Sequence, residues 1–281
     1  MSTTHSLAAA SPNGMKGEII DWRRLGGALL SRIVYPAAGI GTLLSIWWLG
    51  GWIIMQNPDT APFAGFAPEP TFARLLELTG NGAVTKAIVP SLQRIGLGLL
   101  WAVVLGVPVG VGIGLSASLR EVTHLPFQFL RMISPLAWMP IAVLAFPSWD
   151  SAIVFLIAVA AIWPILFSTA QGIRRIDPLW FKVARNLGAG GLQMLHKIIL
   201  PAIGQDIFAG IRLAVGVAWI VLVPAEYLGV TSGLGYAIND ARDTLEYDTL
   251  AAMVVVIGIL GFFLDGVCVR LINRFSWHHE G

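Results

Sequence analysis

Long apolar segments are the feature that most constrains how this chain can fold. A helix needs about 20 apolar residues to cross a bilayer, and six segments of roughly this kind occur, at residues 33–55, 91–115, 125–146, 151–170, 208–228 and 250–272. Composition agrees, because only 12% of the 281 residues are charged, whereas a soluble domain carries roughly 25%. The sequence therefore predicts an all-α membrane protein with six transmembrane helices.

The third apolar segment, residues 125–146, differs from the others. Gln128 and Arg131 interrupt its start, and Pro135 and Pro140 lie in its middle. Proline at membrane depth is tolerated where neighbouring helices or a water-filled cavity satisfy the freed backbone groups. We therefore expect a broken helix in this segment.

Lysine and arginine are distributed unevenly among the connections. They are concentrated before the first segment, between the fourth and fifth segments, and after the last one. Because cytoplasmic loops carry the excess of positive charge, both termini and the central connection are predicted to be cytoplasmic. The resulting domain division has a partly disordered N-terminal tail (1–32), a transmembrane domain (33–275) with a cytoplasmic loop (171–207), and a C-terminal tail (276–281).

The second segment contains glycines at positions 106, 110 and 114. Small residues with this spacing let two helices approach closely, either inside a bundle or between two subunits. Glycine is also common in membrane helices generally, so both interpretations stay open.

Catalytic and metal-binding patterns are absent from the sequence. Cys268 is the one cysteine and is predicted to be a buried, inert thiol. The sequence contains no phosphate-binding loop of the G-x-x-x-x-G-K-[ST] kind. The histidines do not have the spacing of metal ligands. A net charge of +2 gives no reason to expect a nucleic-acid partner. We expect no enzymatic activity and no bound cofactor in this chain.

The central connection carries two short helical patterns. Pro178 opens the first, in which Leu179, Val183 and Leu187 recur at intervals of four. Glycines at 188, 190 and 191 end it, and "LQMLHKIIL" forms a second helix that stops at Pro201. Such a hairpin suits either a lipid surface or a groove on a cytosolic partner.

This hairpin resembles the coupling loop of permeases of ATP-binding-cassette (ABC) importers. The family pattern is Glu-Ala-Ala, three residues, Gly, nine residues and Ile-x-Leu-Pro, and Ala184, Gly188, Ile198 and Pro201 fit it. Lys182 and Val183 depart from it, because they replace the usual Glu and Ala. Further stretches, among them "PLAWMPIAVLAF", "GIRLAVGVAWIVLVPAEYLG" and "SGLGYAINDARD", are similar to the nitrate, bicarbonate, taurine and alkanesulfonate branch.

The resemblance implies the type I ABC importer permease fold in a bacterial inner membrane. The expected partners are two ABC ATPase subunits that carry ATP and Mg, a second permease copy (a homodimer), a periplasmic or lipid-anchored substrate-binding protein, and membrane lipid. The residues expected to couple to the ATPase are Lys182, Val183, Ala184, Arg185, Asn186, Leu187, Gly188, Ala189, Gly190, Ile198, Leu200 and Pro201.

Candidates for the substrate pathway lie in spans two to five. Glu226 is expected near the outer edge of the bilayer, as a gate residue or paired with a base. Arg94, at the outer end of its span, either snorkels or attracts an anion. The third and fourth spans contribute Trp138, Met139, Pro140 and Trp163, as pore lining or as ordinary packing.

Charge within the spans also predicts an ion pair near the cytoplasmic side. Arg212 and Asp265 are within reach of each other, and a buried pair between adjacent helices is the favoured interpretation. The predicted function is import of a small oxyanion, with nitrate or bicarbonate ahead of sulfonate, taurine or phosphite. The alternatives are an ion-coupled secondary transporter that needs no ATPase, and a membrane anchor that transports nothing.

Overall fold

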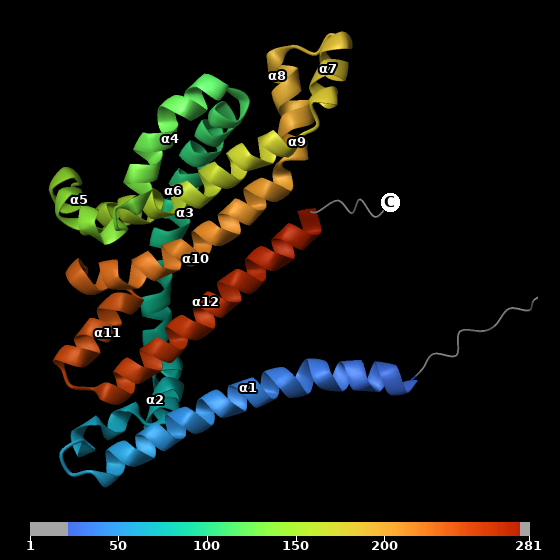
Figure 1. Cartoon of the computed structure of the whole chain (residues 1–281). Helices are drawn as coiled ribbons and strands as arrows, with labels where there is room; N and C mark the ends of the chain where they lie inside the picture. Colours follow the sequence, from blue (N-terminus) through green and yellow to red (C-terminus); the bar gives the residue numbers. More distant parts are fainter. Residues whose placement is uncertain (1–21, 276–281) are drawn as a thin grey trace, which may run out of the picture. The chain divides into compact units, whose positions relative to one another are not determined.

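The structure is a computed structural model that describes residues 22–275. The predicted C-terminal tail and the first 21 residues of the N-terminal tail lie outside this range. The chain forms two units that divide after Gly50, and each is described by itself. Helix α1 (Trp22–Gln56) supplies the first unit and continues into the second (Figure 1).

Two hydroxyl side chains of helix α1 bond to the backbone of the same helix. The hydroxyl of Thr42 donates to the carbonyl of Ala38 at 2.8 Å, and that of Ser45 donates to the carbonyl of Gly41 at 2.8 Å. Hydroxyls bonded in this way to the preceding turn expose no unpaired polar group to an apolar environment. The stretch from Val34 to Gln56 is long and apolar enough to span a membrane.

The second unit consists of helices joined by short connections, and its described part contains no β-strand. Its elements are η1 (Ala61–Phe66), α2 (Pro68–Gly80), α3 (Ala83–Leu115), α4 (Ala117–Met132), η2 (Pro135–Trp138), α5 (Met139–Ala145), α6 (Trp149–Arg175), α7 (Pro178–Asn186), α8 (Gly191–Met194), the π-turn η3 (Leu195–Ile199), α9 (Leu200–Ala202), α10 (Gly204–Gly229), α11 (Leu234–Asp243) and α12 (Tyr247–Phe275). Within residues 22–275, five helices are long and apolar enough to cross a membrane, or six if one bent pair counts as a span.

The bent pair is the third apolar segment. Helix α4 begins at Ala117, earlier than expected, and the chain bends by 88° before Pro135–Ala145 continues. Ser134 is extended (φ −57°, ψ 130°), the conformation that a following proline favours. Pro140 lies in the first turn of α5, where proline does not break a helix. The expected break is therefore present, and Pro135 accounts for its position.

Helix α6 lies at the centre of the second unit, packed against α3 on one side and α10 on the other. The main core forms around the buried residues of α6, and its members include Ile153, Leu156, Ile157 and Leu222. The connection from α6 to α10 projects as a hairpin of α7 and α8 (Figure 1).

The close contact of α3 with α6 depends on glycine. A Cβ atom at Gly98 would lie 2.4 Å from Cγ2 of Ile157, and one at Gly110 would lie 2.7 Å from the carbonyl oxygen of Leu166. Gly106 and Gly114 face α6 in the same way. The glycine spacing noted in the sequence thus serves a helix contact inside the chain.

This contact predicts opposite effects for two neighbouring glycines of α3. Gly98→Ala is expected to destabilise the protein by about 1–3 kcal/mol, because the added methyl group overpacks the contact with Ile157. Gly96, which has no atom within 4 Å of a Cβ position, is the matched control. Gly96→Ala should be neutral or stabilising, since alanine favours a helix more than glycine does.

The measurement is the thermal unfolding midpoint of each variant in detergent. A lower midpoint for Gly98→Ala alone is the expected result. Equal midpoints for the two variants would contradict the glycine-mediated contact.

Candidate functional site

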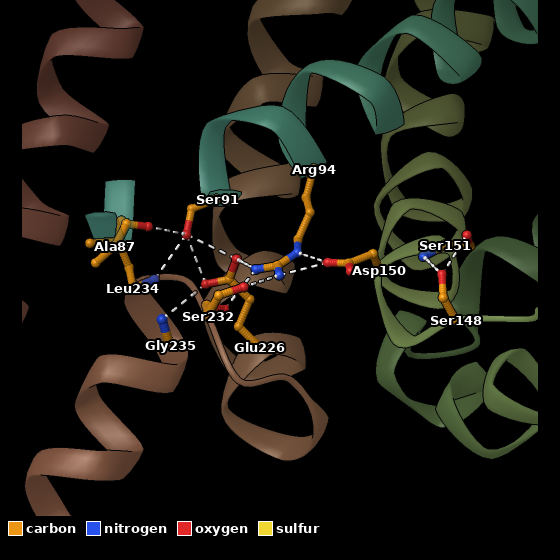
Figure 2. Close-up of polar contacts among 10 residues, drawn as sticks. All are labelled: Ala87, Ser91, Arg94, Ser148, Asp150, Ser151, Glu226, Ser232, Leu234 and Gly235. Atoms are coloured by element: carbon orange, nitrogen blue, oxygen red, sulfur yellow. Dashed lines mark hydrogen bonds and ion pairs between the residues drawn. The ribbon is translucent and has the colours of Figure 1, made fainter. Parts of the chain in front are cut away.

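A group of polar side chains around the buried Arg94 and Glu226 joins three helices at the end of the bundle opposite the α7–α8 hairpin. We call it the Arg94 cluster; its members are Ser91 and Arg94 of α3, Asp150 of α6, Glu226 of α10 and Ser232 of the α10–α11 connection (Figure 2). Helices α6 and α10 each run from this cluster to the hairpin, and the 27 residues of α6 extend about 40 Å.

Arg94 uses its whole guanidinium group within the cluster. Nε donates to Asp150 at 2.7 Å, and Nη2 also contacts Asp150 at 2.6 Å. Nη1 donates to Glu226 at 2.5 Å and to the carbonyl of Ser232 at 2.9 Å, while Nη2 donates to the Ser232 hydroxyl at 2.8 Å. The side chain is 4% exposed, so it does not snorkel.

Glu226 is fully buried, at 0% exposure. Each group that is hydrogen-bonded to its carboxylate is a donor. The Ser91 hydroxyl lies 2.9 Å from both carboxylate oxygens, and the amide of Gly235 donates at 2.9 Å. The Ser91 oxygen itself accepts from the amide of Leu234 at 2.9 Å. A buried carboxylate is stable only when it is paired and hydrogen-bonded in this way.

Two glycines allow the connection after α10 to fold around this carboxylate. Gly233 has φ +110°, a conformation that side chains rarely adopt, and a Cβ atom there would lie 2.5 Å from the Glu226 carboxylate. At Gly235 a Cβ atom would lie 2.3 Å from the carbonyl oxygen of Val223. The "SGLG" sequence is therefore the local reason that the backbone amide of Gly235 reaches Glu226 and that of Leu234 reaches Ser91.

The Arg94 cluster is built as a joint between helices. Two carboxylates against one guanidinium give it a formal charge of −1, and Arg94 has no donor left for a substrate anion. The pairing of Glu226 with a base was among the expectations from sequence. Asp150, Ser91 and Ser232 were missed, although "SWD" at the start of α6 is a typical N-cap followed by an acid in the first turn.

The hairpin at the other end of α6 and α10 has a defined geometry. The Asp177 carboxylate caps α7 by accepting from the amide of Leu179 at 2.8 Å. Gly188 ends α7 with φ +80°, and the amide of Ala189 donates to the carbonyl of Ala184 at 3.0 Å. Such a left-handed glycine after a helix satisfies the last carbonyls.

The hairpin is held by a small core and leaves an apolar stripe outside it. Ala184 is buried together with Met194, Ile199 and Ile203, with Ile198 packed alongside. Leu179, Val183 and Leu187 remain 58%, 49% and 82% exposed. Around this stripe, the other exposed or half-exposed residues of the predicted coupling set are Lys182, Arg185, Asn186, Gly188, Ala189, Gly190, Leu200 and Pro201.

The four candidates from the third and fourth spans lie in three different environments. Trp138 and Trp163 line a pocket of about 290 Å³ between α3, α4 and α6, which is bounded almost entirely by apolar side chains. Met139 is buried in the main core, and Pro140 is exposed at the start of α5. The indole nitrogen of Trp138 is buried and has no hydrogen-bond partner among the described residues. A substrate-pathway role for these four stays a prediction.

The predicted pair of Arg212 and Asp265 is present, with Nε donating to Oδ1 at 2.7 Å. The expectation that it is buried is wrong for this chain, because its two side chains are 45% and 52% exposed. Cys268, one turn further along α12, is half-buried, not fully buried as predicted. Within residues 22–275, no group of three or more His, Cys, Asp or Glu side chains is placed to hold a metal ion.

Removal of Glu226 and removal of Asp150 are expected to have different costs, although both contact Arg94. Glu226→Gln should destabilise the protein by about 3–5 kcal/mol, because it leaves a buried charge without its buried partner. Asp150 is 67% exposed, so Asp150→Asn should cost less than about 1 kcal/mol. Thermal midpoints in detergent measure both, and similar losses would contradict the assignment of Glu226 as the buried partner.

Comparisons with known proteins identify the family. Residues 102–277 match the family described as binding-protein-dependent transport system inner membrane component. The chain is 36% identical to the bicarbonate transport system permease protein CmpB of Synechococcus elongatus, over 90% of each chain. It is 31% identical to the taurine transport system permease protein TauC of Escherichia coli, covering 89% of this chain and 92% of that one.

Two further similarities agree. The nitrate import permease protein NrtB of Leptolyngbya laminosa is 36% identical, over 95% of this chain and 94% of NrtB. The fold is similar to a chain of the MetNI methionine ABC transporter in an inward-facing conformation, with a TM-score of 0.57 and 16% identity, covering 69% of this chain and 96% of that chain. The chain belongs to the inner membrane components of binding-protein-dependent transport systems, in the branch of ABC importer permeases for nitrate, bicarbonate and taurine.

Proposed function

We propose that this chain is the pore-forming subunit of an ATP-driven importer of a small oxyanion, with nitrate or bicarbonate favoured over sulfonate, taurine or phosphite. The relatives named for bicarbonate, nitrate and taurine transport support this class of cargo. ATP and Mg would be bound by a separate ATPase subunit, because this sequence has no phosphate-binding loop.

The observation that carries the proposal is the exposed apolar stripe of the hairpin. Leu179 and Val183 of α7 and Leu187 at its C-cap recur at intervals of four residues and are 58%, 49% and 82% exposed. Basic side chains such as Lys182 and Arg185 flank the stripe. An amphipathic helix of this kind fits a groove on a partner protein, and the ATPase is the partner that the family supplies.

The hairpin is placed to transmit motion to the pore. It connects the ends of α6 and α10, which pack along each other and meet again at the Arg94 cluster about 40 Å away. Because packed helices and buried ion pairs resist gradual deformation, movement of the hairpin would tilt both helices together. Closure of two ATPases around ATP would then switch access to the pore by a rigid-body change.

The proposal also includes the setting of the complex. The hairpin faces the cytoplasm and the Arg94 cluster faces the outside of a bacterial inner membrane, as the distribution of lysine and arginine favours. A second permease copy completes the pore as a homodimer, and a binding protein delivers the anion to the outer face.

The alternative of an ion-coupled transporter is less well supported. Such a protein needs ionisable groups in the membrane that can bind the driving ion. Glu226 and Asp265, the acids expected to serve this purpose, are each paired with an arginine. Neither is free to take up a cation without breaking that pair.

A double substitution in the stripe tests the proposed docking. Val183→Asp with Leu187→Asp is expected to lower co-purification of the ATPase at least tenfold, because two desolvated carboxylates oppose an apolar interface. Leu245→Asp, at a residue that is 67% exposed between α11 and α12, is the matched control and should leave co-purification unchanged.

The measurement is the ratio of ATPase to permease after purification in detergent. Thermal midpoints of the permease alone show that both variants are folded. Retention of the ATPase by the double variant would contradict the assignment of the hairpin as the coupling element.

A further inference from the structure

We infer that Arg212 and Asp265 form a transient oxyanion-binding site in the inner half of the transport pathway. This inference rests on the proposed function, because it assigns a place along the path of the imported anion. The site is distinct from the Arg94 cluster. Glu226, the member of that cluster on α10, lies 14 residues after Arg212, or about 21 Å along the helix.

The pair is joined by two hydrogen bonds yet leaves donors of Arg212 available. Arg212 donates from Nε to Oδ1 of Asp265 at 2.7 Å and from Nη2 to Oδ2 at 2.9 Å. Nη1 has no partner among the residues that the structure describes. This is the reverse of Arg94, whose guanidinium is enclosed and fully used. Arg212 can therefore receive an oxyanion without leaving Asp265.

The position of the pair places it within the spans. Arg212 is eight residues after the start of α10, about 12 Å along the helix, and Asp265 is ten residues before the end of α12, about 15 Å. No other charged residue occurs in α10 between Arg212 and Glu226, or in α12 between residues 249 and 264. Toward the Arg94 cluster the two helices are thus free of other charges, whereas Asp206 of α10 and Arg270 of α12 lie on the side of the hairpin.

Exposure then indicates what the pair faces. Both side chains are about half exposed on this chain, and ionisable groups within spans face a bundle interior or a water-filled cavity because lipid contact is costly. Gly216, one turn beyond Arg212, has no atom within 4 Å of a Cβ position. Because residues four apart share a helix face, the face of α10 that carries Arg212 is unfilled at Gly216 by other residues of the described chain.

The chemistry suits an anion that must pass through. A planar guanidinium matches the geometry of an oxyanion such as nitrate or bicarbonate. Asp265 neutralises Arg212 and, as it stays in place, repels the bound anion, so the site binds weakly. Conduction needs sites that are favourable enough to enter and weak enough to leave.

The test uses the full complex of this chain, its ATPase and its binding protein in proteoliposomes. Nitrate is the probe, with bicarbonate and taurine run in parallel, and both uptake and ATP hydrolysis are measured. Arg212→Gln is expected to lower uptake per ATP hydrolysed at least tenfold, while stimulation of the ATPase by the loaded binding protein stays within twofold. Arg212→Lys keeps the charge but not the planar fork, so its uptake per ATP should lie between those of Arg212→Gln and the unmodified complex.

Asp265→Asn is the matched variant, because it breaks the same ion pair but keeps the guanidinium. Uptake per ATP within threefold of the unmodified complex is expected. Equal losses for Arg212→Gln and Asp265→Asn would mean that the pair only holds α10 to α12, and would overturn the inference. Loss of subunit assembly in Arg212→Gln would mean that a partner covers the pair, and would also overturn it.

A second measurement reports what surrounds Arg212. Arg212→Cys in a Cys268→Ser background carries the one thiol of the chain, since Cys268 is the single cysteine. A water-filled pathway predicts modification by a charged, membrane-impermeant thiol reagent, and no modification would overturn the inference. The Cys268→Ser protein alone gives the background.

The two proposals fail in different ways. If the unmodified complex shows no uptake driven by ATP and the binding protein, the proposed function fails. If the unmodified complex transports and Arg212→Gln transports equally well, only the oxyanion site fails.

Discussion

The close approach of α3 to α6 is the contact on which the rest of the structure depends. Gly98 and Gly110 bring the two backbones together because any side chain there would collide with α6. Arg94 lies one turn before Gly98 on the same face of α3, so the glycine contact sets the register that places its guanidinium beside Asp150. Without that register, Glu226 of α10 would be a buried carboxylate with no counter-charge, which is among the costliest defects that a protein interior can contain.

Helices α6 and α10 convert this local contact into an arrangement suited to transport. One end of each helix is fixed in the Arg94 cluster, and the other end leads into the α7–α8 hairpin (Figure 1). Arg94 and Glu226 are buried in the cluster, whose formal charge is −1, so it fits a joint better than an anion receptor. The half-exposed pair of Arg212 and Asp265 has the opposite character. In the proposed mechanism the buried cluster serves as a fixed joint, the hairpin as the element that moves, and the half-exposed ion pair as a site for the anion.

Much of the fold follows from the sequence, because apolar length and proline position act locally. The helical spans, the break before Pro135 and the short helix that ends before Gly188 are present. The second short helix contains a π-turn and continues through Pro201 to Ala202, so the prediction that it stops at Pro201 is wrong. Contacts between distant residues were harder to predict. Sequence placed Arg94 and Glu226 near the same membrane surface but did not pair them, and it missed Asp150, because a side chain's partner depends on helix rotation and packing. It found the pair of Arg212 and Asp265 but not its exposure, which depends on which face of each helix is covered.

The central claim is that ATP hydrolysis on a partner, transmitted through the hairpin, drives anion import through this chain. Uptake of nitrate, bicarbonate and taurine into proteoliposomes that contain the complex tests it most directly, with ATP supplied to the ATPase side and no ion gradient. We predict that uptake of one of these anions requires both ATP and the loaded binding protein, and that an imposed proton or sodium gradient leaves it unchanged. Uptake that follows such a gradient in the absence of ATP would contradict the account.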